Sequence, residues 1–179
     1  MKKRISWLIY LIISIILVLL QTSFLPEFTT FKVRPDLVLL FVVSIGLVLN
    51  YKQGLLAGAI AGLVAGIISW NLWGLYLLTY CLAGFLAGNL PEKMEADNFF
   101  IPLSASVGAS IIELVLFFVV GSFLNIYQIM GDFFVKALAF LIWNAIFAIP
   151  VFLVVKFIII GEKNTLDIQS SLSDSIIIR

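Results

Sequence analysis

The stretch GLLAGAIAGLVAG, residues 54–66, places a glycine at every fourth position of an apolar run. Residues four apart lie on one face of a helix, so Gly54, Gly58, Gly62 and Gly66 would form a smooth groove. In water such a helix is poor, because each glycine costs about 1 kcal/mol relative to alanine. In a bilayer the backbone has no other hydrogen-bond partner, and a small-residue face lets a second helix approach closely. The stretch therefore predicts a packed transmembrane helix.

The composition of the whole chain agrees with this interpretation. Of its 179 residues, 63% are hydrophobic and 12% are charged, and the mean hydropathy is +1.18. A soluble domain is about half apolar and a quarter charged, so we expect an all-α integral membrane protein. The largest basic cluster, Lys2-Lys3-Arg4, is too small to indicate nucleic-acid binding.

The apolar runs predict a compact bundle of about six transmembrane helices in a single domain, residues 1–160. The predicted spans are residues 5–25, 36–49, 54–69, 75–90, 100–124 and 133–160, and a polar cytoplasmic tail follows at 161–179. The second run reaches only about 22 Å at 1.5 Å per residue, against a hydrocarbon core of about 30 Å. The helix is therefore strained in length, shielded by protein or partly re-entrant, and the re-entrant case would leave five spans.

The basic residues favour one orientation of these spans. With the N-terminus inside, the inner segments hold Lys2, Lys3, Arg4, Lys52, Lys93, Lys156 and Lys163, and the outer segments hold Lys32, Arg34 and Lys136. The positive-inside rule therefore predicts a multi-pass protein with both termini in the cytoplasm.

The fourth predicted span repeats the small-residue pattern at Gly84 and Gly88. We expect the third and fourth spans to form a hairpin across a loop with Trp70 and Trp73, residues typical of a membrane interface. The six glycines Gly54, Gly58, Gly62, Gly66, Gly84 and Gly88 are candidates for helix packing or for a partner interface. Packing within the chain is the simpler hypothesis, and an intermolecular interface is the alternative.

Polar residues within the spans are the candidates for a functional site, because they are costly in a membrane. Glu113 lies midway along the fifth run, and Asn144 lies near the middle of the sixth. Glu113 either is a protonated or hydrogen-bonded carboxyl that ties helices together, with Asn144 or Lys136 as partner, or has a functional role. That role would be a proton, cation or ligand site, or a contact to a helix of a partner protein. Arg34 and Asp36 are candidates for recognition at the outer face, for which a helix cap and a surface ion pair are the simpler explanation.

The residues present give little support to an enzyme. The chain has no histidine and one cysteine, which excludes histidine-based metal sites and a Ser-His-Asp triad. It contains no phosphate loop, zinc motif or nucleophile elbow. A single carboxylate at depth lacks the second acid or base that catalysis usually needs. We therefore expect no catalytic, cofactor-binding or metal-binding residues.

Four segments resemble the MreD family of bacterial rod shape-determining membrane proteins. They are RPDLVLL at 34–40, the glycine row at 54–66, GLY at 74–76 and YCLAGFLAG at 80–88. The resemblance covers about residues 1–160. It implies a non-enzymatic scaffold of the cell-elongation machinery, or elongasome, in the bacterial cytoplasmic membrane, where it helps to organise peptidoglycan synthesis. The implied partners are an MreC-like membrane protein, the wall synthases and an MreB-like filament.

The same family is similar in architecture to the S components of energy-coupling-factor vitamin transporters. This similarity implies an alternative function, a membrane subunit that binds a small molecule. Such a subunit needs an outward-facing pocket with polar groups. A scaffold instead needs an uncovered face, and part of the small-residue hairpin could bind a transmembrane helix of the MreC-like partner.

Overall fold

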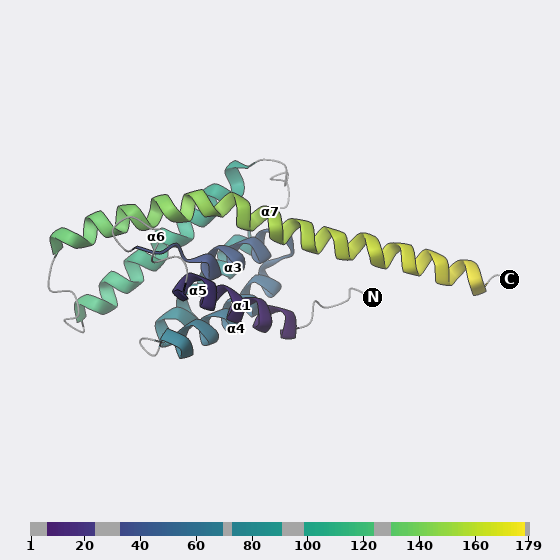
Figure 1. Cartoon of the computed structure of the whole chain (residues 1–179), viewed down its shortest axis with the longest axis horizontal. Coiled ribbons are helices and arrows are strands. Elements are labelled where there is room, and N and C mark those ends of the chain that lie inside the picture. The colour runs from purple at the N-terminus through teal and green to yellow at the C-terminus, as the bar shows by residue number, and fades with distance from the viewer. Residues whose placement is uncertain (1–6, 24–32, 70–72, 91–98, 124–129, 178–179) are drawn as a thin grey trace.

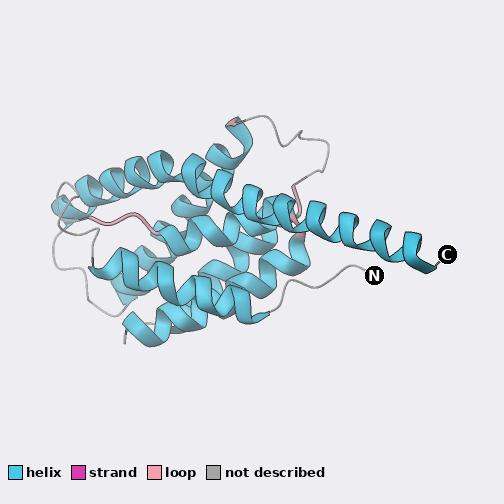
Figure 2. Ribbon diagram, turned by 45° about the vertical axis from the view of Figure 1, so that its right-hand side comes forward, coloured by secondary structure: helices cyan, strands magenta, loops and turns pink. Residues whose placement is uncertain are grey.

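The computed structural model describes residues 7–23, 33–69, 73–90, 99–123 and 130–177, and these ranges form six helices and no strand. The helices are α1 (Trp7–Ser23), α3 (Leu37–Val48), α4 (Tyr51–Ser69), α5 (Trp73–Gly88), α6 (Phe100–Phe123) and α7 (Met130–Ile177). Figures 1 and 2 show the long helix α7 lying with α6 across one side of a bundle of shorter helices. The prediction of an all-α bundle is confirmed.

The lengths and surfaces of the helices are those of a membrane protein. Within the described ranges, three helical segments are long and apolar enough to cross a bilayer, namely Tyr51–Ser69, Phe100–Phe123 and Phe133–Ile159. Large apolar side chains point outward, including Ile67 at 66% exposure and Phe157 at 81%. Large apolar side chains exposed on so many helices are unfavourable in water, and lipid tails would cover them.

Helix α3 lies at the centre of the bundle. All ten residues from Leu37 to Gly46 are buried, and the helix contacts α1, α4, α5, α6 and α7. Its 12 residues rise only about 18 Å at 1.5 Å per residue. Protein therefore shields this short helix on its sides, which was one of the three explanations that its length allowed.

Helices α4 and α5 make the most extensive contact of any two helices in the described ranges. An added Cβ atom at Gly58 would collide with the carbonyl oxygen of Tyr80, and one at Gly62 would meet the Cα atom of Leu77. The same holds for Gly54 against the carbonyl oxygen of Gly84. Backbone atoms cannot rotate out of the way as side chains can, so only glycine permits this approach.

The C-terminal segment, which was predicted as a polar tail, is helical as far as Ile177. Helix α7 contains Pro150 and continues without a break to Ile177, through the polar residues that follow position 160. Figure 1 shows this yellow part of α7 extending beyond the rest of the bundle. The beginning of α1 and the C-terminal end of α7 lie at the same end of the bundle in both views.

Candidate functional site

Polar side chains from four parts of the chain meet inside the bundle. This polar cluster consists of Asp36, Tyr80, Ser110, Glu113 and Asn144, none of which is more than 7% exposed. Burying a polar group without a hydrogen bond costs several kcal/mol in a purely apolar environment. The cluster therefore depends on the bonds that its members make to one another.

Asp36 is the centre of the polar cluster. Its Oδ1 atom accepts a hydrogen bond of 2.9 Å from the backbone N–H of Leu39, which makes it the N-cap of α3. Its Oδ2 atom accepts a bond of 2.5 Å from the hydroxyl of Tyr80 in α5. Aspartate is a preferred N-cap residue, and the positive end of the helix stabilises its charge.

Asn144 connects α7 to this centre and to α6. Its Oδ1 atom accepts a hydrogen bond of 2.8 Å from the backbone N–H of Asp36, and its Nδ2 atom donates one of 2.7 Å to Oγ of Ser110. Ser110 in turn donates to the carbonyl oxygen of Ser106 at 2.8 Å. Both polar ends of a fully buried amide are thus used, and three elements are joined by one side chain.

Glu113 of α6 lies beside the centre, with its buried carboxyl group close enough to interact with that of Asp36. Asn144, which the sequence suggested as the partner of Glu113, lies in the same cluster but bonds to Asp36 and Ser110. Lys136, the other suggested partner, is exposed. The structure thus brings together three residues singled out from the sequence and pairs them differently.

The outer-face candidates are separated by the structure. Arg34 is exposed, whereas Asp36 is buried. Trp70 lies outside the described residues. Trp73 begins α5, but its side chain is not among those described.

Two members of the polar cluster, Tyr80 and Ser110, were not singled out from the sequence. The sequence contains a feature that could have identified each of them. A buried tyrosine hydroxyl usually needs a hydrogen-bond partner, and Tyr80 stands inside an apolar helix. Ser110 precedes Glu113 by three residues, which places both on one side of a helix. Neither feature identifies the partner on another helix.

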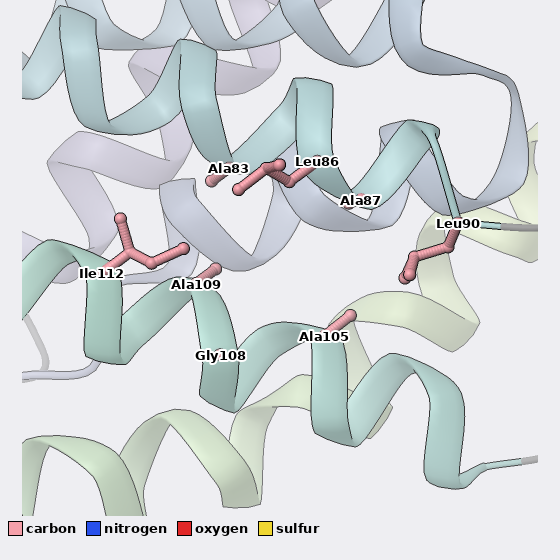
Figure 3. Close-up of a pocket in the computed structure, with 8 residues that line it drawn as sticks. All are labelled: Ala83, Leu86, Ala87, Leu90, Ala105, Gly108, Ala109 and Ile112. Atoms are coloured by element: carbon pink, nitrogen blue, oxygen red, sulfur yellow. The ribbon is translucent and has the colours of Figure 1, made fainter.

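An apolar cavity of about 160 Å³ lies between α5 and α6. Figure 3 shows its lining, which is formed by Ala83, Leu86, Ala87, Leu90, Ala105, Gly108, Ala109 and Ile112. Ligand pockets usually measure about 300–1,000 Å³ and contain a few polar groups that orient the ligand. This cavity is smaller, and its lining side chains are all apolar. The described residues also contain no group of three or more His, Cys, Asp or Glu side chains able to hold a metal ion.

Comparison with known proteins identifies a family. The family model described as rod shape-determining protein MreD matches residues 1–159. No curated protein and no solved structure matches the chain. The matched range contains every member of the polar cluster and the glycines of α4 and α5. The similarity to the S components of vitamin transporters stays a prediction.

Proposed function

The chain belongs to the MreD family of rod shape-determining proteins, and we propose that it acts as a non-enzymatic scaffold of the cell-elongation machinery. In this proposal it binds an MreC-like membrane protein and, through it, the wall synthases and an MreB-like filament. The complex would help to organise peptidoglycan synthesis. The observation that carries the proposal is the family match over residues 1–159.

The hydrogen bonds inside the bundle and the apolar lining of its cavity support a scaffold. The members of the polar cluster bond mainly to one another, and the cavity between α5 and α6 offers no polar group for a ligand. A scaffold in a membrane needs only an outer face that another helix can pack against. These features favour the scaffold over the small-molecule subunit.

The surface available to a partner is narrower than the glycine pattern suggested. Backbone atoms of α5 cover Gly54, Gly58 and Gly62, so those positions serve contacts within the chain. We propose that the partner's transmembrane helix contacts an exposed apolar face instead. Four helices are candidates for this contact, because each has exposed apolar side chains. Examples are Leu63 on α4, Leu86 on α5, Ile111 on α6 and Leu153 on α7.

We further propose that the protein lies in the bacterial cytoplasmic membrane with both termini in the cytoplasm. The common position of the start of α1 and the end of α7 supports termini on one side (Figures 1 and 2). Reporter fusions at each terminus test the orientation. Cytoplasmic activity of both fusions is expected, and a periplasmic signal from either one would contradict it.

Depletion in the native rod-shaped cell tests the proposed function. We expect the depleted cells to become round, and we expect affinity purification of the protein to recover an MreC-like membrane protein. Unchanged cell shape together with recovery of an ATPase module would instead establish the transporter subunit.

Photo-crosslinking then tests direct binding. A photoreactive amino acid is placed at one exposed position per helix, at Leu63, Leu86, Ile111 or Leu153, with buried Val42 as the control. We expect crosslinks to the MreC-like protein from one or two neighbouring helices and none from position 42. Absence of a crosslink from every exposed position, in variants that preserve cell shape, would contradict direct binding through these helices.

A further inference from the structure

Two carboxyl groups meet in the interior of the bundle. Asp36 and Glu113 are each 7% exposed, and their carboxyl groups lie close enough to interact with one another. Two ionised carboxylates in these positions cannot bond to one another, because neither has a hydrogen to donate. Two adjacent negative charges also repel strongly when water is excluded. One proton on one of the two groups would remove this repulsion and allow a hydrogen bond between them.

The surrounding donors decide which group holds that proton. Both oxygens of Asp36 already accept hydrogen bonds, one from the N–H of Leu39 and one from the hydroxyl of Tyr80. The group also lies at the N-terminus of α3, where the helix dipole favours negative charge. Among the described residues, no donor reaches the buried Oε2 atom of Glu113. A charge is stabilised where donors converge and is costly where they are absent.

We propose that Asp36 and Glu113 form a proton-binding site, in which Glu113 holds the proton and donates it to the ionised carboxylate of Asp36. The titratable groups around the pair are Tyr76 and Tyr80 of α5 and, before α3, the exposed Arg34. From α7 the neutral amide of Asn144 faces Asp36. The pair thus carries a single negative charge.

This site links α6 to the beginning of α3. Glu113 belongs to α6, which packs on α7, whereas Asp36 belongs to the segment that caps central α3. Release of the proton would place two negative charges in contact and would push α6 away from α3 and α5. The proposal goes beyond the scaffold function, since it makes the position of α6 depend on one bound proton.

Isotope-edited infrared spectroscopy of the purified protein in lipid nanodiscs tests the proposal. At pH 7 an ordinary glutamate, with a reference pKa of about 4.3, is almost entirely ionised. We expect a carbonyl stretching band of a protonated carboxylic acid at pH 7, which shifts when glutamate is labelled with ¹³C and stays in place when aspartate is labelled. Absence of the band, or a shift with labelled aspartate only, would overturn the proposal.

Matched variants provide a second test. Glu113→Gln should remove the band and remain folded, because its amide can still donate to Asp36. Glu162→Gln, the same change in a carboxyl outside the cluster, should leave the band unchanged. Survival of the band in folded Glu113→Gln would overturn the proposal. If a sodium ion replaces the proton, the band is absent and sodium chloride raises the melting temperature above that in choline chloride, which also overturns it. The labelling experiment uses the unaltered chain, so it tests the proposal even if a variant fails to fold.

Discussion

The hydroxyl of Tyr80 donates a hydrogen bond to Oδ2 of Asp36, which joins the middle of α5 to the residue that caps α3. The two residues are 44 positions apart, and Tyr80 is fully buried. Hydrogen bonds to an ionised acceptor are about twice as strong as those between neutral groups. Because Asn144 bonds to the same aspartate, α5, α7 and the beginning of α3 are held at one residue.

Removal of the tyrosine hydroxyl should weaken this junction. Tyr80→Phe leaves Oδ2 of Asp36 without its donor in a buried site. We expect a loss of about 1–3 kcal/mol in the free energy of unfolding, measured by denaturant titration in detergent. Tyr51→Phe is the matched control at a residue that is 40% exposed, and it should change stability by less than about 0.5 kcal/mol. Equal effects of the two substitutions would contradict the role given to Tyr80.

The contact between Asn144 and Ser110 should appear as a coupling energy. In a double-mutant cycle of Asn144→Ala and Ser110→Ala, we expect the two changes to be coupled by about 0.6 kcal/mol, the average for such bonds in membranes. Asn144→Ala should be the more destabilising single change, because it also leaves the N–H of Asp36 unpaired.

Ser122 provides the control for this cycle. It is exposed, and its hydroxyl bonds to the carbonyl oxygen of Phe118 within its own helix. A cycle of Asn144→Ala with Ser122→Ala should therefore show no coupling. Coupling of similar size in both cycles would mean that the first one reports a general loosening of the bundle.

Two glycines should respond oppositely to the same substitution. The Cβ atom of Gly58→Ala would collide with backbone atoms of Tyr80, so we expect a large loss of folded protein by size-exclusion chromatography and thermal unfolding. No atom outside the local helix lies within 4 Å of a Cβ atom placed at Gly108. Gly108→Ala should therefore be neutral or raise stability by up to about 1 kcal/mol, from helix propensity alone. Unchanged stability of Gly58→Ala would contradict the close packing of α4 on α5.

Alanine substitutions at Asp36 and Arg34 should have different effects on the cell, although the two residues are only two positions apart. Asp36→Ala removes the N-cap of α3, worth about 0.5–2 kcal/mol, and also the acceptor for Tyr80. We expect lower membrane levels and rounder cells when this variant replaces the native protein. Arg34→Ala, at an exposed side chain, should preserve both membrane level and shape. Round cells with normal levels of Arg34→Ala would instead show that Arg34 recognises a partner.

The sequence by itself determined the class of protein and the local structure, because these depend on composition and on neighbours along the chain. Hydrophobicity and small-residue spacing predicted a helical membrane bundle, and Pro35-Asp36 predicted the beginning of a helix. Glu113 and Asn144 stood out because polar groups are costly within apolar runs.

Only the tertiary structure decided which of these groups meet. Asp36 contacts Tyr80 and Asn144 across 44 and 108 residues, and these distances depend on how the helices cross and turn about their axes. A glycine row shows that a close approach is possible, but the backbone of α5 shows where it takes place. Local pattern specifies what a helix face can accept, whereas the packing of all the helices together specifies what lies against it.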